Sequence, residues 1–316
     1  MEENTEQRVD LTLFSEKIQE LKDRIASVIV GQEQTVDLVL TAILANGHVL
    51  IEGVPGVAKT LLARLTARLI DADFSRVQFT PDLMPSDVLG TTVFNMKTNG
   101  FDFHQGPIFA DIVLVDEINR APAKTQAALF EVMEERQISI DGTTHRMGDL
   151  YTILATQNPV EQEGTYKLPE AQLDRFLMKI TMDYPSLEEE VNILERHHTN
   201  AALVKLDDIT PAITKEELLS LRAFMNQVFV DRTLLQYIAL IVQQTRTSKA
   251  VYLGASPRAS VAMLQSSKAY ALLQGRDFVT PEDIKFVAPY VLQHRLILTA
   301  EAEMEGYSPV KVTQRL

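Results

Sequence analysis

The chain contains no cysteine. Because thiols are absent, disulfide bonds, thiolate metal sites and cysteine nucleophiles are excluded, and this composition fits an intracellular, cytoplasmic location. No apolar run approaches the roughly 18 residues that a membrane-spanning helix needs. Residues 1–10 are polar and acidic, so we expect no signal peptide there. Internal repeats and low-complexity segments are also absent from the sequence.

An excess of positive charge is lacking as well. The chain has 30 basic and 43 acidic residues, which gives a net charge of −13 at pH 7. An acidic chain is a poor general binder of nucleic acid or anionic membranes, although a local basic stripe would not show in the net count. Hydrophobic residues make up 46% of the chain, which is enough for a sizeable core. The length of 316 residues is sufficient for two domains.

The segment with the strongest functional signal is a glycine-containing loop between a short apolar run and a helical pattern. Strand, tight glycine loop, Lys-Thr and helix is the layout of a phosphate-binding loop. Lys59 would reach the β- and γ-phosphates of a nucleotide, and Thr60 would ligate Mg²⁺. The general pattern has glycine just before the lysine, but here the residue is Ala58. Since alanine resists positive φ, we expect the backbone at Ala58 to be near-helical.

Short apolar segments alternate with helical ones through the first part of the chain. Strands are predicted at residues 48–52, 76–80, 112–116, 151–156 and 177–182. Such alternation is typical of a parallel sheet that is covered on both faces, with ligands at the carboxyl ends of its strands. Two hairpins interrupt it, near residues 91–103 and 137–147, where Asn-Gly and Asp-Gly lie between alternating apolar residues.

Composition also predicts the domain organisation. Residues 1–13 are expected to form a flexible arm, and residues 14–184 the α/β domain. Beyond residue 184 the strand pattern stops, and residues 185–316 are expected to form a mainly helical domain. Its helices are predicted at residues 187–198, 215–228, 232–247, 257–273 and 281–292.

Two carboxylates follow the third predicted strand. Residues 112–115 are all apolar, as in a central strand buried on both faces, and Asp116 and Glu117 come at its end. Carboxylates are costly to bury unless they face a cation or water. Asp116 would therefore hold Mg²⁺, directly or through water, and Glu117 would polarise the water that attacks the γ-phosphate.

Three further polar residues are weaker candidates on their own. Asn158 follows the fourth predicted strand and could orient the attacking water, although Asn-Pro turns are common. Arg175 lies just before the last strand and could stabilise transition-state charge, often from a neighbouring subunit, or form a surface ion pair. Arg258 begins a helix and could touch the γ-phosphate or simply face solvent. The adjacent His197 and His198 are interpreted as surface residues, and no metal other than Mg²⁺ is expected.

These segments together resemble an AAA+ ATPase of the MoxR family, over nearly the whole chain. The most specific pieces are EGVPGVAKT at 52–60, VDEINRAP at 115–122, ATQNP at 155–159, EGTY at 163–166, LPEAQLDRF at 168–176 and GASPR at 254–258. Alanine is usual in that family at position 58. Lys167 stands where the family pattern has proline, a change in a loop.

The resemblance implies a role for each matched residue. Lys59 and Thr60 belong to Walker A, Asp116 and Glu117 to Walker B, Asn158 is sensor 1, Arg175 the arginine finger and Arg258 sensor 2. It leaves open whether Arg258 acts on its own or on a neighbour's nucleotide. The nucleotide contacts that it implies are Val30, Gly31, Gln32, Gly53, Val54, Pro55, Gly56, Val57, Ala58, Lys59, Thr60, Leu61 and Arg258.

The resemblance also implies a fold and a function. The fold is an α/β P-loop AAA+ core with a parallel sheet and two inserted β-hairpins, followed by a helical lid. The function is Mg-ATP-dependent remodelling of protein clients by a homo-oligomeric ring, usually a hexamer, often with a partner that carries a von Willebrand A domain. The alternatives are a nucleic-acid motor, a metal-chelatase-type motor subunit and an ATP-dependent assembly scaffold. The acidic balance disfavours nucleic acid.

Overall fold

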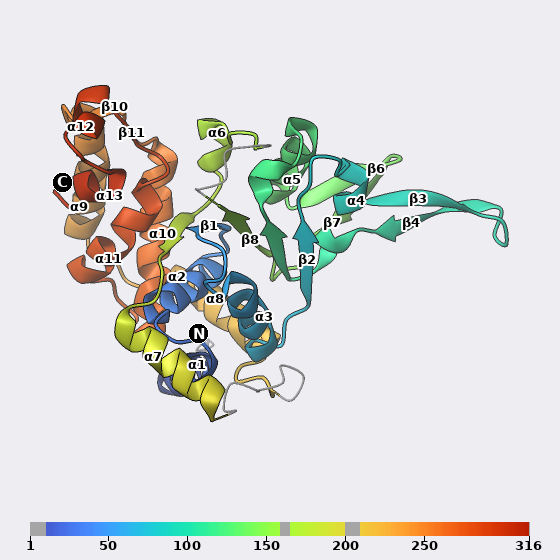
Figure 1. The fold of residues 1–316 in the computed structure, drawn as a ribbon, viewed down its shortest axis with the longest axis horizontal. Helices are drawn as coiled ribbons and strands as arrows, with labels where there is room; N and C mark the ends of the chain where they lie inside the picture. The colour runs from blue at the N-terminus through green and yellow to red at the C-terminus, as the bar shows by residue number, and fades with distance from the viewer. Residues whose placement is uncertain (1–10, 159–164, 200–208, 316) are drawn as a thin grey trace, which may run out of the picture.

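The computed structural model describes residues 11–158, 165–199 and 209–315. Its centre is a five-stranded sheet in which neighbouring strands run parallel, in the order β2-β5-β8-β1-β9 (Figure 1). The five predicted strands all form, with ends that differ from the prediction by at most two residues. Strands β1, β2, β5, β8 and β9 span Val49–Gly53, Phe74–Gln78, Ile112–Asp116, Thr152–Gln157 and Met178–Met182.

Both faces of the sheet are buried because successive strand residues point to opposite sides. In β5, Ile112 and Leu114 belong to one hydrophobic core, whereas Val113 and Val115 belong to a second one. The first core contains side chains of α1, α2 and α3, and the second contains side chains of α5. These helices span Leu11–Val28, Glu33–Leu44, Lys59–Leu69 and Ala123–Glu135.

Helices α1 and α2 are separated by residues 29–32. Helix α1 begins at Leu11, so residues 11–13 are helical and do not belong to a flexible arm; residues 1–10 lie outside the described residues. Helix α2 ends beside Asn46 and Gly47. Asn46 has a φ of 56°, and the Gly47 N–H donates to the Ala42 carbonyl at 2.9 Å.

Both predicted hairpins form. The first pairs β3 (Gly90–Asn95) with β4 (Gly100–Gln105) and projects away from the rest of the chain (Figure 1). The second pairs β6 (Gln137–Ile140) with β7 (Thr143–Arg146) through Asp141 and Gly142, which both have positive φ, as a two-residue hairpin turn requires. Short helical segments flank them at Pro85–Leu89 (α4), Pro107–Phe109 and Ile118–Arg120.

The C-terminal part of the chain is mainly helical, as predicted. Helices α6 to α11 span Glu170–Leu173, Leu187–His198, Lys215–Phe224, Arg232–Thr247, Pro257–Leu273 and Pro281–Leu292, with a 3-10 segment at Met225–Gln227. The expectation that strands stop beyond residue 184 is wrong, because β10 (Val251–Leu253) and β11 (Ile297–Leu298) form a small antiparallel pair. Two short helices, α12 (Ala300–Met304) and α13 (Pro309–Thr313), follow.

Helix α8 is fixed against the sheet-containing part of the chain by charged side chains. Lys215 forms an ion pair with the buried Asp111 at 2.5 Å. Arg222 donates to the Asn46 side-chain oxygen at 2.8 Å and to the Asp149 carbonyl at 2.6 Å. These contacts hold α8 against the residue before β5, the residues before β8 and the end of α2.

Candidate functional site

The predicted phosphate-binding loop connects β1, which ends at Gly53, with α3, which begins at Lys59. The first N–H groups of a helix have no partner within the helix, and together with the helix dipole they form an anion site. The Lys59 ammonium donates to the Gly53 carbonyl at 2.6 Å, so it folds back over the loop. Burial lowers the pKa of Lys59, whereas the charges of Asp116 and Glu117 oppose this shift.

The backbone of this loop corrects one prediction. Ala58 has φ 60° and ψ 23°, which is the left-handed region and not the near-helical conformation expected from its side chain. The chain has to enter α3 directly at Lys59, and this turn needs a left-handed residue just before it. For alanine such a conformation costs about 1–2 kcal/mol, which the rest of the loop must offset.

The two carboxylates after β5 share a partner in the neighbouring strand. The Thr156 hydroxyl donates to Oδ1 of Asp116 at 3.1 Å and accepts from the Glu117 N–H at 3.0 Å. Asp116 is buried, and Glu117 has a φ of 55°, so the chain turns sharply between them and directs the two side chains differently. Thr156 thereby fixes both residues at the end of the sheet where the phosphate loop lies.

Cationic and amide side chains surround the same carboxylates. The Arg76 Nε donates to Oδ2 of Asp116 at 2.6 Å, and the Gln78 amide donates to Oε2 of Glu117 at 2.8 Å. Arg120 forms an ion pair with Glu117 at 3.0 Å. Sequence analysis missed these residues. The alternation of Arg76 and Gln78 along a strand next to β5 is the signal that could have revealed them, since both side chains face the same side.

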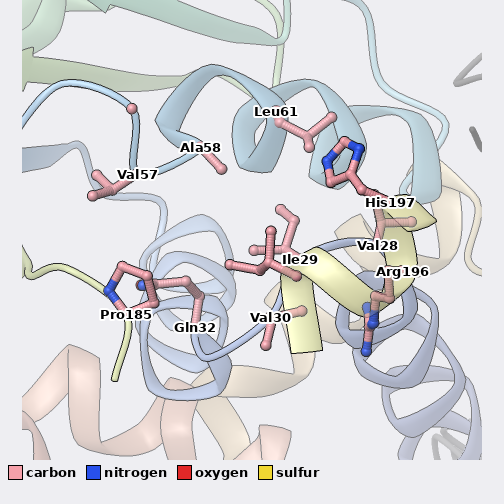
Figure 2. Close-up of a pocket in the computed structure, with 12 residues that line it drawn as sticks. Val28, Ile29, Val30, Gln32, Val57, Ala58, Leu61, Pro185, Arg196 and His197 are labelled. Carbon is pink, nitrogen blue, oxygen red and sulfur yellow. The ribbon is translucent and has the colours of Figure 1, made fainter. Parts of the chain in front are cut away.

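A cavity of about 260 Å³ opens beside the phosphate loop. Its walls come from the end of α1, the α1–α2 connection, the loop, the start of α3, α7, and Pro185 two residues before α7 (Figure 2). Of the predicted nucleotide contacts, Val30, Gln32, Gly56, Val57, Ala58 and Leu61 line this cavity. The mixture of apolar walls and loop backbone suits a purine next to a phosphate chain.

The wall that α7 contributes was not predicted. Pro185, Ile193, Arg196 and His197 line the cavity, and the His197 ring lies beside Leu61 and Val28 in Figure 2. His197 is exposed, as expected, but it borders the cavity and is not remote from it. The spacing of 193, 196 and 197 on one helical face was the available signal.

Helix α7 is tied to the last turn of α1 and packs against the α1–α2 connection. The Arg196 guanidinium donates to the carbonyls of Ala26 at 3.0 Å and Ser27 at 2.7 Å. Gly31 has a φ of 72°, and a Cβ built on it would lie 2.3 Å from the Glu189 carboxylate. The positive φ and the nearby Glu189 carboxylate both favour glycine at this position, which lies in the α1–α2 connection but does not line the cavity.

Asn158 is buried just beyond β8, at the same end of the sheet as Asp116 and Glu117. Because all five strands are parallel, their carboxyl ends lie along one edge. The phosphate loop, both carboxylates and Asn158 thus come together there. Residues 159–164, which include part of the EGTY segment, lie outside the described residues.

Arg175 and Arg258 lie apart from this group. Arg175 precedes β9, so it lies at the amino ends of the strands, and the five residues of β9 separate the two edges by about 16 Å. Both arginines line a second, open cavity of about 690 Å³ that Glu134, Arg136 and Arg295 also border. Both arginines form ion pairs with Glu134. The distance from its carboxylate is 3.7 Å to Nε of Arg175 and 3.2 Å to Nη2 of Arg258.

Comparison with known proteins agrees with this arrangement. Residues 48–178 match the family described as "ATPase family associated with various cellular activities (AAA)", and residues 243–316 match the AAA lid domain. The chain is 44% identical to Chaperone MoxR1 of Mycobacterium tuberculosis over 92% of this chain and 78% of that protein. It is 30% identical to Protein MoxR of Methylorubrum extorquens over 93% of this chain and 91% of the relative.

The chain belongs to the MoxR family of AAA ATPases. A crystal structure of a proposed ATPase from Cytophaga hutchinsonii superimposes with a TM-score of 0.88 at 41% identity, and the match covers 96% of this chain and 94% of the other. The predicted fold class is therefore confirmed: an AAA α/β core with a parallel sheet and hairpins, then a helical lid. Membership of this ATPase family implies that the chain binds and hydrolyses ATP.

Two further properties of this MoxR-family chain concern metals and membranes. Among the described residues, no group of three or more histidine, aspartate or glutamate side chains could hold a metal ion. Magnesium in nucleotide sites does not need such a group, because it keeps one or two protein ligands beside phosphate oxygens and water. Within the same described ranges, no helix is both long and apolar enough to cross a bilayer.

Proposed function

We propose that this ATPase works as a homo-oligomeric ring, usually a hexamer in this family, which hydrolyses ATP between subunits and uses the cycle to remodel protein clients. The observation that carries the proposal is the separation of Arg175 and Arg258 from the subunit's own phosphate loop. The phosphate loop and the two arginines lie at opposite edges of the same sheet, about 16 Å apart along β9. An arginine at that edge can serve a γ-phosphate only if the nucleotide belongs to a neighbouring subunit.

The chemistry that we propose is in-line attack of water on the γ-phosphate. Lys59 and the loop N–H groups hold the phosphates, Glu117 accepts the proton of the attacking water, and Asn158 orients that water. Gln78 and Arg120 are hydrogen-bonded to Glu117 in the present arrangement, so the carboxylate must exchange these partners before it can accept a proton. Arg175 of the adjacent subunit would stabilise the charge that develops on the transferred group.

Thr60 and Asp116 are the residues that would hold Mg²⁺. The Thr60 hydroxyl lies in the first turn of α3, and the buried Asp116 carboxylate lies at the end of β5, and such oxygen ligands fit this hard cation. Asp116 is already paired with a cation, the Arg76 guanidinium. When bound, Mg²⁺ neutralises charge on the phosphate oxygens. Arg76 has a half-exposed side chain and can turn away into solvent when the carboxylate is needed.

The β3–β4 hairpin is the part that we propose to contact protein clients. Phe94, Met96 and Phe101 are exposed near its tip, and the two phenylalanine rings meet edge to face at 5.2 Å. Exposed apolar side chains gathered on a projecting element mark an interaction site. Apart from Lys97, the hairpin carries no Lys or Arg between 90 and 105, which argues against the nucleic-acid motor. A von Willebrand A-domain protein as partner, and the cytoplasm as the place of action, are also part of the proposal.

Steady-state ATPase activity measured against protein concentration, with size analysis in parallel, tests the shared site. We expect activity per subunit to rise with concentration as a ring forms, and Arg175→Ala to abolish turnover while ATP binding persists. Glu117→Gln should likewise bind ATP, but its rate of hydrolysis should be lower than that of the wild type by a factor of about 10² or more. Flat activity in a monomer, or a silent Arg175→Ala, would overturn the shared site and favour an assembly scaffold.

A further inference from the structure

Glu134 lies between the two arginines of the second cavity. It is in the last turn of α5, and its two oxygens are divided between them, with Oε2 facing Arg175 and Oε1 facing Arg258. Arg175 comes from the segment before β9, whereas Arg258 comes from the first turn of α10 in the helical lid. One carboxylate thus joins guanidinium groups from two parts of the fold.

The two arginines differ in how firmly they are otherwise held. Arg175 also donates to the Phe130 carbonyl, one turn before Glu134 on the same helix. For Arg258, Glu134 is the only ion-pair partner among the described residues, and 60% of its side chain is exposed. Two guanidinium groups this close repel each other, so without Glu134 we expect Arg258 to swing into solvent.

We propose that Glu134 is a positioning residue, which holds Arg175 and Arg258 side by side as one two-arginine site for the γ-phosphate of a neighbouring subunit. The inference rests on the proposed function and adds a residue to it. The paired guanidinium groups leave a net positive charge at the cavity after Glu134 is counted. Because side chains that are already in place lose less freedom when the phosphate arrives, the carboxylate lowers the barrier to turnover without touching the nucleotide.

Other hydrogen bonds fix the chain next to the two arginines. The Arg295 guanidinium binds Asp174 at 2.6 Å, and the Ser256 hydroxyl donates to Asp174 at 3.2 Å. These bonds fix the residues that adjoin Arg175 and Arg258 in the chain. The chain next to both arginines is therefore held, and Glu134 fixes the side chain of Arg258 and, together with the Phe130 carbonyl, that of Arg175.

The test compares Glu134→Ala with Glu135→Ala, which removes an equal charge one residue further on. Glu135 is exposed and has no ion pair within the described part of the chain, which makes it a matched control. For Glu134→Ala we expect kcat to fall about tenfold, with KM for ATP and the ATP affinity of dilute protein unchanged within about twofold. Glu134→Gln keeps one acceptor oxygen, so its kcat should lie between those of Glu134→Ala and the wild type.

Each other outcome overturns the proposal in a recognisable way. If Glu134→Ala turns over as fast as Glu135→Ala or faster, the carboxylate does not position the arginines. If ATP affinity or ring assembly falls together with kcat, its role is structural. If Arg175→Ala is silent, the shared site itself fails, whereas loss of turnover in Arg175→Ala with an unaffected Glu134→Ala removes only the role of Glu134.

Discussion

The hydroxyl of Thr156 and the carboxylate of Asp116 are joined across adjacent strands by a hydrogen bond of 3.1 Å. The same hydroxyl accepts the Glu117 N–H. We expect Thr156→Val, which keeps the shape of the side chain, to lower kcat about tenfold, since losing a hydrogen bond to a charged group costs about 1.5–3 kcal/mol. ATP affinity should change little, because Thr156 does not line the cavity beside the loop.

Steady-state kinetics together with nucleotide titration at equilibrium would check this prediction. Thr156→Ser keeps the hydroxyl and serves as the control, with kcat close to that of the wild type. Equal kcat for Thr156→Val and Thr156→Ser would show that the bond to Asp116 is not needed for turnover.

Gly31 allows Glu189 to pack against the α1–α2 connection. In Gly31→Ala the new methyl group would meet the Glu189 carboxylate and the backbone would keep a positive φ. We expect weaker ATP binding, by about tenfold, because the Glu189 carboxylate must give up its bond to the Ser186 N–H and the strained connection that lines the cavity must shift. Isothermal titration with a non-hydrolysable ATP analogue measures this change.

A matched glycine separates the two effects of that substitution. Gly306 has a φ of 79°, and a Cβ at this position would meet nothing within 4 Å, so Gly306→Ala adds backbone strain of about 1–2 kcal/mol without a contact. Nucleotide affinity should be unchanged in Gly306→Ala. Adding Glu189→Ala to Gly31→Ala should restore part of the affinity, and no recovery would mean that the contact with Glu189 is irrelevant.

His48 makes the stability of the fold depend on pH. Its Nδ1 accepts from the Ile153 N–H at 3.0 Å, so its Nε2 carries the proton and donates to the Met133 carbonyl at 3.2 Å. Burial, helped by Arg136, lowers the pKa of His48 to about 3. Between this value and the ordinary pKa of about 6.5, the unfolded state binds a proton that the folded state does not.

The free energy of unfolding should therefore rise with pH across that window, by at most about 1.4 kcal/mol per pH unit from this group. Urea unfolding at several pH values between 4.5 and 7 measures the slope. His48→Asn should reduce the slope, and buried His294, whose pKa is also lowered by burial, supplies part of what remains. The exposed His104→Asn should leave the slope as in the wild type. Identical slopes for both variants would contradict the assignment to His48.

Arg295 connects the end of α11 to the segment that carries Arg175. Its side chain is only 4% exposed, it pairs with Asp174, and it donates to the Phe176 carbonyl at 2.7 Å. We expect Arg295→Met to lower the free energy of unfolding by about 3 kcal/mol, because it leaves a partly buried carboxylate without its cation. Denaturant unfolding measures the loss, and the exposed Arg232→Met, in which a similar change meets solvent, should cost less than about 0.5 kcal/mol.

Local pattern was sufficient for most of the fold. The apolar run at residues 112–115 predicted a strand buried on both faces, and β5 has that burial on both sides. The helix predicted at residues 281–292 begins at Pro281 as α11, and the Asp283 carboxylate accepts the Thr280 N–H at 2.7 Å. These signals succeed because strand alternation and helix caps depend on neighbours in the sequence.

The prediction failed where the surroundings override the residue. Ala58 adopts the left-handed region because the turn between β1 and α3 requires it, which no property of alanine indicates. The β10–β11 pair was missed because two- and three-residue strands carry too little alternation to detect. Lys167, noted as a departure from the family pattern, is exposed and forms an ion pair with Glu170 at 3.8 Å.

By itself, the sequence determined the order of the elements and the chemistry of the loop. Residue type and spacing were enough to predict Lys59, Thr60, Asp116 and Glu117 as site residues. Only the tertiary structure decided which side chains meet. It brought Thr156, Arg76 and Gln78 to the two carboxylates through strand pairing, and it separated Arg175 and Arg258 from them by the length of a strand. The physical reason is that, in a parallel sheet, residues at the same end of different strands lie at the same edge. Which strands are neighbours depends on pairing between distant segments, so no local segment determines it.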